Sequence, residues 1–547
     1  MMPNLERIFI WFKSNFWLIL ILSLSFGLRV YNLSHVPPGF WFDEASFSYS
    51  AYSVLETGKD EFGQFLPLAF KSFGQYNAPL IFYWLIPFIK ILGLNVFASR
   101  FSCAILGVLT TYGLYLLGAE LFKSKKVGLF SALFFAISPF SLQFNRMVHE
   151  NNLMVFLLVF GVLFLIQGLK SVNKFLLGTI FLGLTYYTYL SARIFTTLFI
   201  LLFLFVYRDE LSKNIRKILL AGITFLIILI PFLWFLTTPA AWPRVNQTSF
   251  WSDPGVVLRI NEARGKYPTG NITAKLLYNK FTGYTATFIG NYLSHFNPRF
   301  LLFDGDPVKI YKTPGVGIMY FWEFGLLSIG IIFLIKNKLQ PQGFFIIGWL
   351  LLSFLPASLT RFVPSSSRSF QACPVICLIS AWGLSSLLQI LTKLKHKNIL
   401  VIFFGLMVVA NFIYYLNQYY IYLPKLYAYE WRDGAQAAIE YVKNIDGEYK
   451  QIIVDQEGIS YVNWLFFLKY PPSEVQKEAL LTEPDKFGFS YIPKIGKYYF
   501  VKEPPENLNK KELYIGRNWD NLNSGRILSV TKDHNGKNSF FIVSFQK

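Results

Sequence analysis

Charged residues are scarce in this chain. Only 15% of its 547 residues are Asp, Glu, Lys or Arg, whereas 54% are hydrophobic and 58 are Phe. A soluble protein of this length needs far more polar surface than this composition supplies, so an ordinary soluble protein is excluded. The composition instead predicts an α-helical polytopic membrane protein.

Cysteine is almost absent as well. The three residues, Cys103, Cys373 and Cys377, all fall inside apolar segments. This pattern shows neither a disulfide framework nor a metal motif, and it indicates packing residues. A small-residue cleavage site is also missing after the first apolar segment. We therefore expect that segment to remain as a membrane anchor and not to be removed as a signal.

The net charge of +20 comes from Lys and Arg residues in short clusters between apolar segments. Such scattered clusters are typical of membrane-protein loops, so we expect no nucleic-acid partner. Apolar segments of about 20 residues predict about eleven transmembrane helices. The predicted crossings are 15–33, 97–121, 127–144, 153–169, 175–190, 194–207, 218–236, 315–335, 343–360, 370–391 and 399–420.

These crossings place all the loop clusters on the side of the N-terminus, which the positive-inside rule makes cytoplasmic. The clusters are Lys123, Lys125 and Lys126; Lys170 and Lys174; Arg208, Lys213, Arg216 and Lys217; Lys336 and Lys338; and Lys393, Lys395 and Lys397, beside Arg7 and Lys13. We expect the protein to lie in the plasma or inner membrane with a cytoplasmic N-terminus.

The apolar segment 79–94 does not fit this pattern as a crossing, because counting it would invert every later loop. We predict that it forms an interfacial helix within a first external loop, 34–95. The alternative is an ordinary crossing whose partner was missed elsewhere. A second long external loop is predicted over 237–314.

Residues 425–547 have a different character, with many charges and no apolar segment long enough to cross a membrane. Their pattern predicts a helix over 436–443 and strands over 451–454, 498–501 and 540–543. The sequence therefore predicts a transmembrane domain over 1–424 and a small extracytoplasmic α/β domain over 425–547. We expect the small domain to cap the membrane domain, with binding of an acceptor or glycan as the alternative.

An acidic pair, Asp43-Glu44, lies in the first external loop. Carboxylates are costly near a bilayer and are usually retained there for function, so this pair is the leading candidate for a catalytic site. The alternative is that the pair caps a helix beginning at Ala45, since acids are favoured at helix N-termini. The predicted topology places further polar residues on the same side, and these are Lys71, Asn77, Tyr83, Arg146, His149, Glu150, Arg193, Arg361, Arg368, Asp304 and Asp306.

The acidic pair in the first external loop resembles the signature of the GT-C superfamily of membrane glycosyltransferases. Within that superfamily, the chain is most similar to the family of protein O-mannosyltransferases and aminoarabinose transferases. The supporting motifs are Gly-Gln-Phe-Leu-Pro at 63–67, Asn-Ala-Pro-Leu-Ile-Phe-Tyr-Trp at 77–84, Arg100 before an apolar span, Ser138-Pro139, and Arg146 with Glu150. The resemblance covers 15–210 well and 290–390 more loosely. It implies a GT-C type membrane domain that transfers a sugar from a polyprenyl-phosphate donor to a hydroxyl of a protein, lipid or glycan on the extracytoplasmic face.

By this resemblance, Asp43 is the general base that removes the acceptor proton, and a direct displacement inverts the anomeric centre. Glu44 and Glu150 complete the predicted catalytic acids, with Glu150 orienting the acceptor or holding a cation. An ion pair between Arg146 and Glu150, one helical turn apart, is the structural alternative. Asp43 and Glu150 are also ligands of the type that Mg²⁺ or Mn²⁺ accepts, although the reaction as argued does not require a metal.

The leaving group is a lipid phosphate, which needs a cation to neutralise its charge. We expect Arg368 to bind it, followed by Arg193, Lys71 and Arg146; anchoring of a span at the headgroup level is the alternative for Arg368. Many relatives carry a Lys just before the Pro that opens the interfacial helix, whereas this chain has Asn77-Ala78-Pro79. The remaining site-shaping candidates are Asn77, Tyr83, His149 and Asp306, of which His149 and Asp306 also fit simple turns.

The rival function is a transporter or flippase of a lipid-linked or anionic solute. Transporters place charges within their spans and show inverted repeats. Here the middles of the predicted spans are nearly free of charge, and the acids gather at one face. This distribution favours an enzyme over a transporter, and over a non-catalytic scaffold.

Overall fold

The computed structural model describes residues 2–336, 341–485, 488–519, 522 and 525–545, with side chains from residue 15 onward. Lys338, one of the predicted cytoplasmic loop residues, lies outside them. The chain divides into two compact units. Unit 1 comprises residues 1–28, 107–142 and 154–412, and unit 2 comprises residues 29–106, 143–153 and 413–547.

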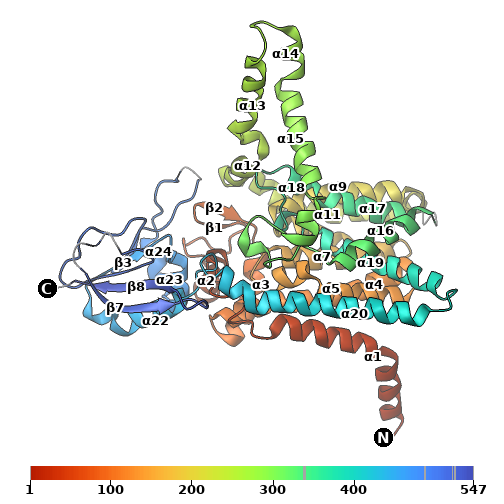
Figure 1. The fold of residues 1–547 in the computed structure, drawn as a ribbon, viewed down its shortest axis with the longest axis horizontal. Helices are drawn as coiled ribbons and strands as arrows, with labels where there is room; N and C mark the ends of the chain where they lie inside the picture. Colours follow the sequence, from red (N-terminus) through yellow and green to blue (C-terminus); the bar gives the residue numbers. More distant parts are fainter. Residues whose placement is uncertain (1, 337–340, 486–487, 520–521, 523–524, 546–547) are drawn as a thin grey trace. The chain divides into compact units, whose positions relative to one another are not determined.

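Unit 1 is helical (Figure 1). Its helices, some of which begin or end in unit 2, are α1 (Met2–Val30), α4 (Val96–Phe122), α5 (Lys125–Ile137), α6 (Pro139–Asn145), α7 (Asn151–Gly168), α8 (Val172–Leu184), α9 (Leu190–Val206), α10 (Arg208–Leu211), α11 (Ile215–Leu236), α12 (Pro243–Thr248), α13 (Pro254–Gly265), α14 (Ile272–Leu277), α15 (Lys280–Ser294), α16 (Phe321–Lys336), α17 (Gln342–Ser353), α18 (Leu355–Ser358), α19 (Ala372–Leu391) and α20 (Lys397–Asn417).

Each predicted crossing coincides with a helix or a pair of helices. Within the described residues, five helical segments are long and apolar enough to cross a membrane, and the number is six if the bent pair α5–α6 counts as one span. Shorter apolar helices include Leu80–Leu92 and Leu190–Val206. The predicted number of eleven crossings stays a prediction.

The tightest helix packing in unit 1 joins α16 to α19. A Cβ atom on Gly330 would lie 2.2 Å from the carbonyl oxygen of Ile379, and one on Gly383 would lie 2.1 Å from that of Leu326. Only glycine permits this approach, and small residues are the usual means of close packing between membrane helices. The same α19 also packs against α5.

Unit 2 combines a mixed sheet with helices. Its elements are α2 (Phe42–Thr57), β1 (Phe70–Ser72), β2 (Gln75–Asn77), α3 (Leu80–Leu92), α21 (Leu423–Leu426), α22 (Ala435–Ile445), β3 (Gln451–Asp455), α23 (Tyr461–Leu468), α24 (Pro472–Glu478), β4 (Lys494–Ile495), β5 (Tyr498–Val501), β6 (Glu512–Gly516), β7 (Arg526–Lys532) and β8 (Asn538–Ser544). The six-stranded sheet has the order β4-β5-β3-β6-β8-β7, in which β3 is parallel to β5 and β6.

Alternation along the strands divides the sheet into two faces. Ile452 and Val454 of β3 join the core that includes Ile439 of α22 and Trp464 of α23, whereas Ile453 between them packs with Tyr514 in a smaller cluster. The β-rich C-terminal region that the sequence predicts is therefore present.

The segment predicted as the first external loop shares this core. The ring of Phe40 lies 4.6 Å from that of Phe466, and the Asn463 side-chain amide donates to the Phe40 carbonyl at 2.9 Å. The Tyr49 hydroxyl donates to the Tyr470 carbonyl at 2.8 Å. These contacts fix α2, the helix that begins beside the acidic pair, against α23 and the loop that follows it.

A buried carboxyl lies in the same region. Glu61 is fully buried, and one of its oxygens accepts a hydrogen bond from Ser50 at 2.6 Å. Burial, together with the charge of the neighbouring Asp60, raises the pKa of Glu61 to about 8. The folded protein therefore holds this side chain neutral at pH 7.

Replacing Glu61 with Gln should flatten the pH dependence of stability. Between pH 4.5 and about 8 the folded state keeps the Glu61 proton while the unfolded chain releases it, so the free energy of unfolding falls as pH rises through this range. Each unit of pKa difference is worth about 1.4 kcal/mol, so the loss amounts to a few kcal/mol. Thermal unfolding in detergent from pH 5 to 9 measures it, with the exposed Glu56→Gln as control. An unchanged slope in Glu61→Gln would contradict the assignment.

Candidate functional site

The acidic pair lies in the first turn of α2. The helix begins at Phe42, so Asp43 occupies its second position and Glu44 its third. Glu44 accepts a hydrogen bond from the backbone N–H of Trp41 at 3.1 Å, as a capping residue does. Asp43 is half-buried at the positive end of the helix, where a carboxylate is stabilised in its charged form. The capping alternative thus describes Glu44.

Glu44 forms a bidentate ion pair with Arg100, near the start of α4. The distances are 3.0 Å from Nε to Oε1 and 2.9 Å from Nη2 to Oε2, and both side chains are 0% exposed. Oε1 also accepts the backbone N–H of Val148 at 2.9 Å. Both oxygens of the buried carboxylate are therefore hydrogen-bonded, which is what burial of a charge requires.

The Arg100 guanidinium also holds the loop that leads into α2. Its Nη1 donates to the carbonyls of Leu33 at 3.2 Å and Pro37 at 2.8 Å, and its Nη2 donates to Gly39 at 2.9 Å. Gly39 has a positive φ of 62°, and a Cβ there would lie 2.1 Å from the Trp431 carbonyl oxygen. The loop before Asp43 is thus fixed from both sides.

Arg146 is buried and holds the same loop. Its Nη2 donates to the carbonyls of Tyr31 and Val36, each at 2.8 Å, and its Nε donates to the Tyr419 hydroxyl at 3.3 Å. The guanidinium lies over the rings of Tyr419 and Tyr420. This placement favours a positioning role for Arg146 over the predicted contact with phosphate.

Hydrogen bonds of asparagine side chains stabilise the turn that carries His149 and Glu150. The Asn145 amide donates to the Asn152 side chain at 2.6 Å, and Nε of Arg29 donates to Asn145 at 2.9 Å. Nδ1 of His149 accepts the backbone N–H of Asn151 and lies 4.0 Å from a Glu150 oxygen. Because the backbone N–H of Val148 donates to Glu44, the structure brings this turn to the start of α2.

Lys71, Asn77 and Tyr83 follow in the same unit. Lys71 lies on β1 with its ammonium 5.3 Å from the Phe62 ring, and Asn77 ends β2 and is buried. The Tyr83 hydroxyl donates to the Pro67 carbonyl at 2.9 Å, and burial raises its pKa to about 12. These contacts give Tyr83 a part in shaping the first loop.

Arg193, Arg368 and Asp306 belong to unit 1. Asp306 is buried and accepts hydrogen bonds from the backbone N–H and the hydroxyl of Ser366, at 2.6 and 2.7 Å. Burial raises the pKa of Asp306, while these hydrogen bonds and the nearby Arg368 lower it. Asp306 therefore anchors the turn that presents Arg368.

His295, at the end of α15, holds the same turn. Its Nε2 accepts the backbone N–H of Ser365 at 3.1 Å, and its Nδ1 lies 2.9 Å from the Asn291 carbonyl oxygen. A carbonyl only accepts, so Nδ1 carries the proton and the imidazole is neutral. Burial lowers the pKa of His295 to about 4.

A cavity of about 240 Å³ in unit 1 is lined by three arginines, Arg193, Arg244 and Arg368. The ring of Phe232 lies 4.7 Å from the Arg193 guanidinium, and Nε of Arg193 donates to the Tyr186 carbonyl at 3.2 Å. Most of the remaining wall is aromatic or aliphatic, as at Trp242, and hydroxyl residues such as Ser191 and Thr248 also line it; none of the described residues that line it is acidic. The cavity thus combines positive charge with an apolar lining.

Several of these residues were not predicted as site residues. The sequence identifies Arg100 only as a motif residue, although an Arg near the start of an apolar helix indicates a charged partner. Arg244, in a segment rich in Trp and Pro, gave no distinguishing signal. His295 was one of five histidines and lacked a neighbour at a recognised spacing.

Residues 77–235 match the model of the family described as dolichyl-phosphate-mannose-protein mannosyltransferase. The resemblance to this family is confirmed. The matched segment of this mannosyltransferase family holds Arg100, Arg146, Glu150 and Arg193, whereas Asp43 precedes it. No curated protein sequence matches the chain.

Solved structures of GT-C glycosyltransferases are similar to the chain. ArnT from Cupriavidus metallidurans bound to undecaprenyl phosphate has a TM-score of 0.55 at 11% identity and covers 97% of this chain and 98% of its own. The apo form has a TM-score of 0.51 at 12% identity, covering 84% and 85%. The oligosaccharyltransferase AglB from Archaeoglobus fulgidus, in complex with an inhibitory peptide and a dolichol-phosphate, has a TM-score of 0.47 at 13% identity, covering 84% and 64%. The likeness to ArnT confirms the predicted GT-C fold.

Within the part of the chain that the structure describes, no group of three or more His, Cys, Asp or Glu side chains is arranged to hold a metal ion. The predicted cation at Asp43 and Glu150 stays untested.

Replacing Arg100 with Ala should destabilise unit 2 by about 3–5 kcal/mol, because it leaves the buried Glu44 carboxylate without its cation. Thermal unfolding of the purified protein measures the change. Lys477→Ala breaks an exposed pair with Glu474 and serves as the control, with an expected loss below about 1 kcal/mol. Equal losses in the two variants would show that the Arg100 pair is not structural.

Proposed function

We propose that this protein transfers a sugar from a polyprenyl-phosphate donor to an acceptor hydroxyl, with Asp43 as the general base and inversion at the anomeric carbon. The observation that carries the proposal is the arrangement of the acidic pair. Glu44 is fully buried and paired with Arg100, whereas the adjacent Asp43 is half-buried at a helix N-terminus fixed by that pair. The family match over 77–235 and the fold shared with ArnT support the reaction class.

The arginine-lined cavity supports a lipid phosphate as the donor group. Arg193, Arg244 and Arg368 bring three positive charges to one apolar cavity, and a guanidinium pairs with phosphate through two hydrogen bonds. An anion attached to an apolar chain matches both the positive charge and the apolar side chains of the cavity wall.

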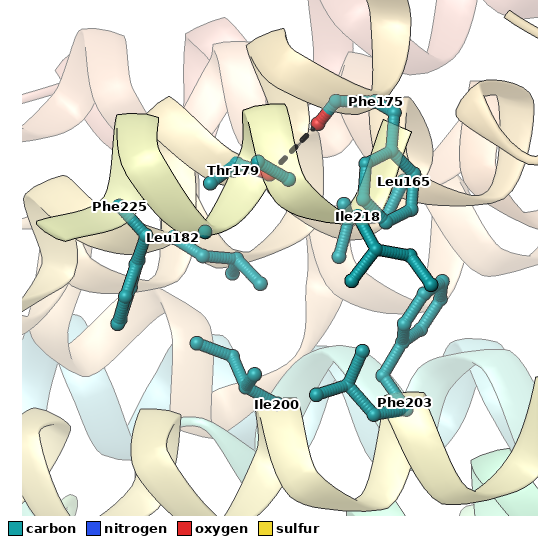
Figure 2. Close-up of a pocket in the computed structure, with 11 residues that line it drawn as sticks. Leu165, Phe175, Thr179, Leu182, Ile200, Phe203, Ile218 and Phe225 are labelled. Atoms are coloured by element: carbon teal, nitrogen blue, oxygen red, sulfur yellow. Dashed lines mark hydrogen bonds between the residues drawn. The ribbon is translucent and has the colours of Figure 1, made fainter. Parts of the chain in front are cut away.

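A second cavity offers a place for that chain (Figure 2). It has a volume of about 180 Å³ and is lined almost entirely by apolar residues of α7, α8, α9 and α11. Figure 2 shows Ile200 and Phe203 of α9 facing Leu182 and Phe225 of α8 and α11 across it. Arg193 precedes Ile200 by seven residues on α9, which corresponds to about 10 Å of helix. We propose that the isoprenoid runs along α9 from the arginine cavity toward this one.

The reaction then proceeds as a single displacement. The acceptor oxygen bonds to the anomeric carbon while the bond from that carbon to the phosphate oxygen breaks. The acceptor proton passes to Asp43, and the polyprenyl phosphate leaves as an anion. The acceptor is a protein, lipid or glycan hydroxyl on the extracytoplasmic face. A divalent cation is not required.

Replacing Asp43 with Asn should lower sugar transfer by about 10²- to 10⁴-fold, the range typical of a lost general base. Its thermal stability should stay close to that of the wild type, because Asp43 is half-buried while the paired Glu44 remains. Transfer from labelled polyprenyl-phosphate mannose, arabinose and related donors in membranes measures the effect, with carrier loss followed together with product.

The matched control is Glu56→Gln, which removes an exposed acid from the same helix and should leave transfer unchanged. Glu44→Gln should lower transfer and stability together, since it breaks the Arg100 pair. Normal transfer by Asp43→Asn would overturn the base assignment. Movement of labelled carrier across the bilayer without cleavage would favour the transporter instead.

Replacing Arg368 with Gln should raise the KM for the donor while the protein stays folded, because the lost charge faces the cavity. Loss of a hydrogen bond to a charged group costs about 1.5–3 kcal/mol, equivalent to roughly a 10- to 150-fold change. Arg193→Gln and Arg244→Gln should act in the same direction. Initial rates at varied donor concentration measure the effect.

Arg299→Gln is the control, because it removes an exposed arginine whose partner is Asp304. It should leave the KM unchanged. If all three cavity variants keep the wild-type KM, the phosphate lies elsewhere, and Lys71→Gln becomes the next variant to measure.

A further inference from the structure

Unit 1 carries a helical hairpin, α13–α15, that stands clear of its other helices (Figure 1). It comprises residues 254–294 and follows α11, the strongly apolar candidate span that ends at Leu236. Val256 and Ile260 of α13 are buried, and the Cβ position of Gly283 on α15 lies against the Ile260 side chain. The two helices thus pack on each other, and the outer faces are left exposed.

The outer faces of the hairpin are strongly apolar. Phe281 is 80% exposed, Ile272 72% and Leu276 68%. On α15 this exposure continues through Ile289 and Leu293, which follow Phe281 at helical spacings of eight and twelve residues. Contiguous apolar surface of this kind marks an interaction site, because leaving it in water is unfavourable.

The hairpin is also basic. Residues 254–294 contain five Lys or Arg and one Glu, a net charge of +4. The basic residues are exposed, and they are Arg259, Arg264, Lys266, Lys275 and Lys280. An amphipathic helix with basic residues and large exposed apolar side chains is the type that binds in the interface of an anionic membrane.

The base of the hairpin meets a helix with a lipid-type surface. The Tyr292 hydroxyl donates to the carbonyl of Leu351 on α17, and Leu351 is itself 47% exposed. Trp242 and Trp251, between α11 and the hairpin, are also exposed. Membrane proteins commonly place such aromatic residues at the level of the lipid headgroups. Figure 1 shows the hairpin projecting across the direction of α9 and α17. Since spanning helices lie near the membrane normal, this direction runs along the membrane surface.

We propose that α13–α15 lies on the bilayer surface, with Phe281 and its apolar neighbours inserted among anionic phospholipid headgroups. Net positive charge excludes the hydrocarbon core, and the exposed apolar stripe excludes bulk water, so the interface is the environment that satisfies both. The predicted loop 237–314 is longer than the short loops on which the positive-inside rule rests, so its basic residues do not conflict with an external position.

A fluorophore at position 281 tests the proposal in the full-length protein. The native cysteines Cys103, Cys373 and Cys377 are buried, so a polarity-sensitive label attaches selectively to Phe281→Cys. In nanodiscs containing phosphatidylglycerol, its emission should shift to the blue and be quenched by lipids that carry a shallow spin label. Asn261→Cys, exposed on the polar side of α13, is the control and should show neither effect.

Charge dependence gives a second measurement. Each basic residue near an anionic surface contributes about fivefold to binding, so Lys266→Gln, Lys275→Gln and Lys280→Gln together should weaken insertion about 100-fold. The lipid quenching at position 281 should then fall to the level seen in pure phosphatidylcholine. A label that stays water-exposed in both lipids would overturn the proposal. A label shielded equally in both, and only when two copies share a disc, would also overturn it and identify a second copy of the chain as the partner.

Discussion

The buried ion pair between Glu44 and Arg100 is the interaction on which the rest of the site depends. A charge without solvent is tolerated only when every oxygen and N–H finds a partner. Here the carboxylate receives Arg100, Trp41 and Val148, and the guanidinium also binds carbonyls of the loop before α2. One pair therefore joins the start of α2, the entry of α4 and the turn at 145–151. The neighbouring Asp43 acquires its fixed position from this pair.

Burial distinguishes the two arginines beside the loop before α2 from the three that line the cavity. Arg100 and Arg146 are completely buried, and each donates to backbone carbonyls of the loop before α2, so both help to hold that loop. Arg193, Arg244 and Arg368 are half-buried and line a cavity. A ligand can reach only a guanidinium that is open to a cavity, which is why the proposed phosphate contact is assigned to these three arginines. Hydrogen bonds of Asp306 and His295 fix the turn that carries Arg368.

The C-terminal sheet region packs against the first loop. Phe40 and Tyr49 of the first loop pack or hydrogen-bond with Phe466 and Tyr470. The loop that carries the acidic pair thus shares a hydrophobic core with β3, α22 and α23. Such a core gives a loop rigidity that its own sequence does not supply, and a rigid scaffold is what holds a catalytic carboxylate in place. The capping role expected for residues 425–547 stays a prediction.

The membrane class, the positions of the apolar helices, the acidic pair and the family resemblance can all be read from the sequence alone. These properties depend on composition and on patterns within a few dozen residues. Only the tertiary structure decided which charge is enclosed and which is available. Glu44 and Arg100 are 56 residues apart, and Arg244 meets Arg368 in one cavity only because distant helices converge. Whether a charged side chain is enclosed or accessible depends on what packs around it. That packing is set by contacts between segments far apart in the chain.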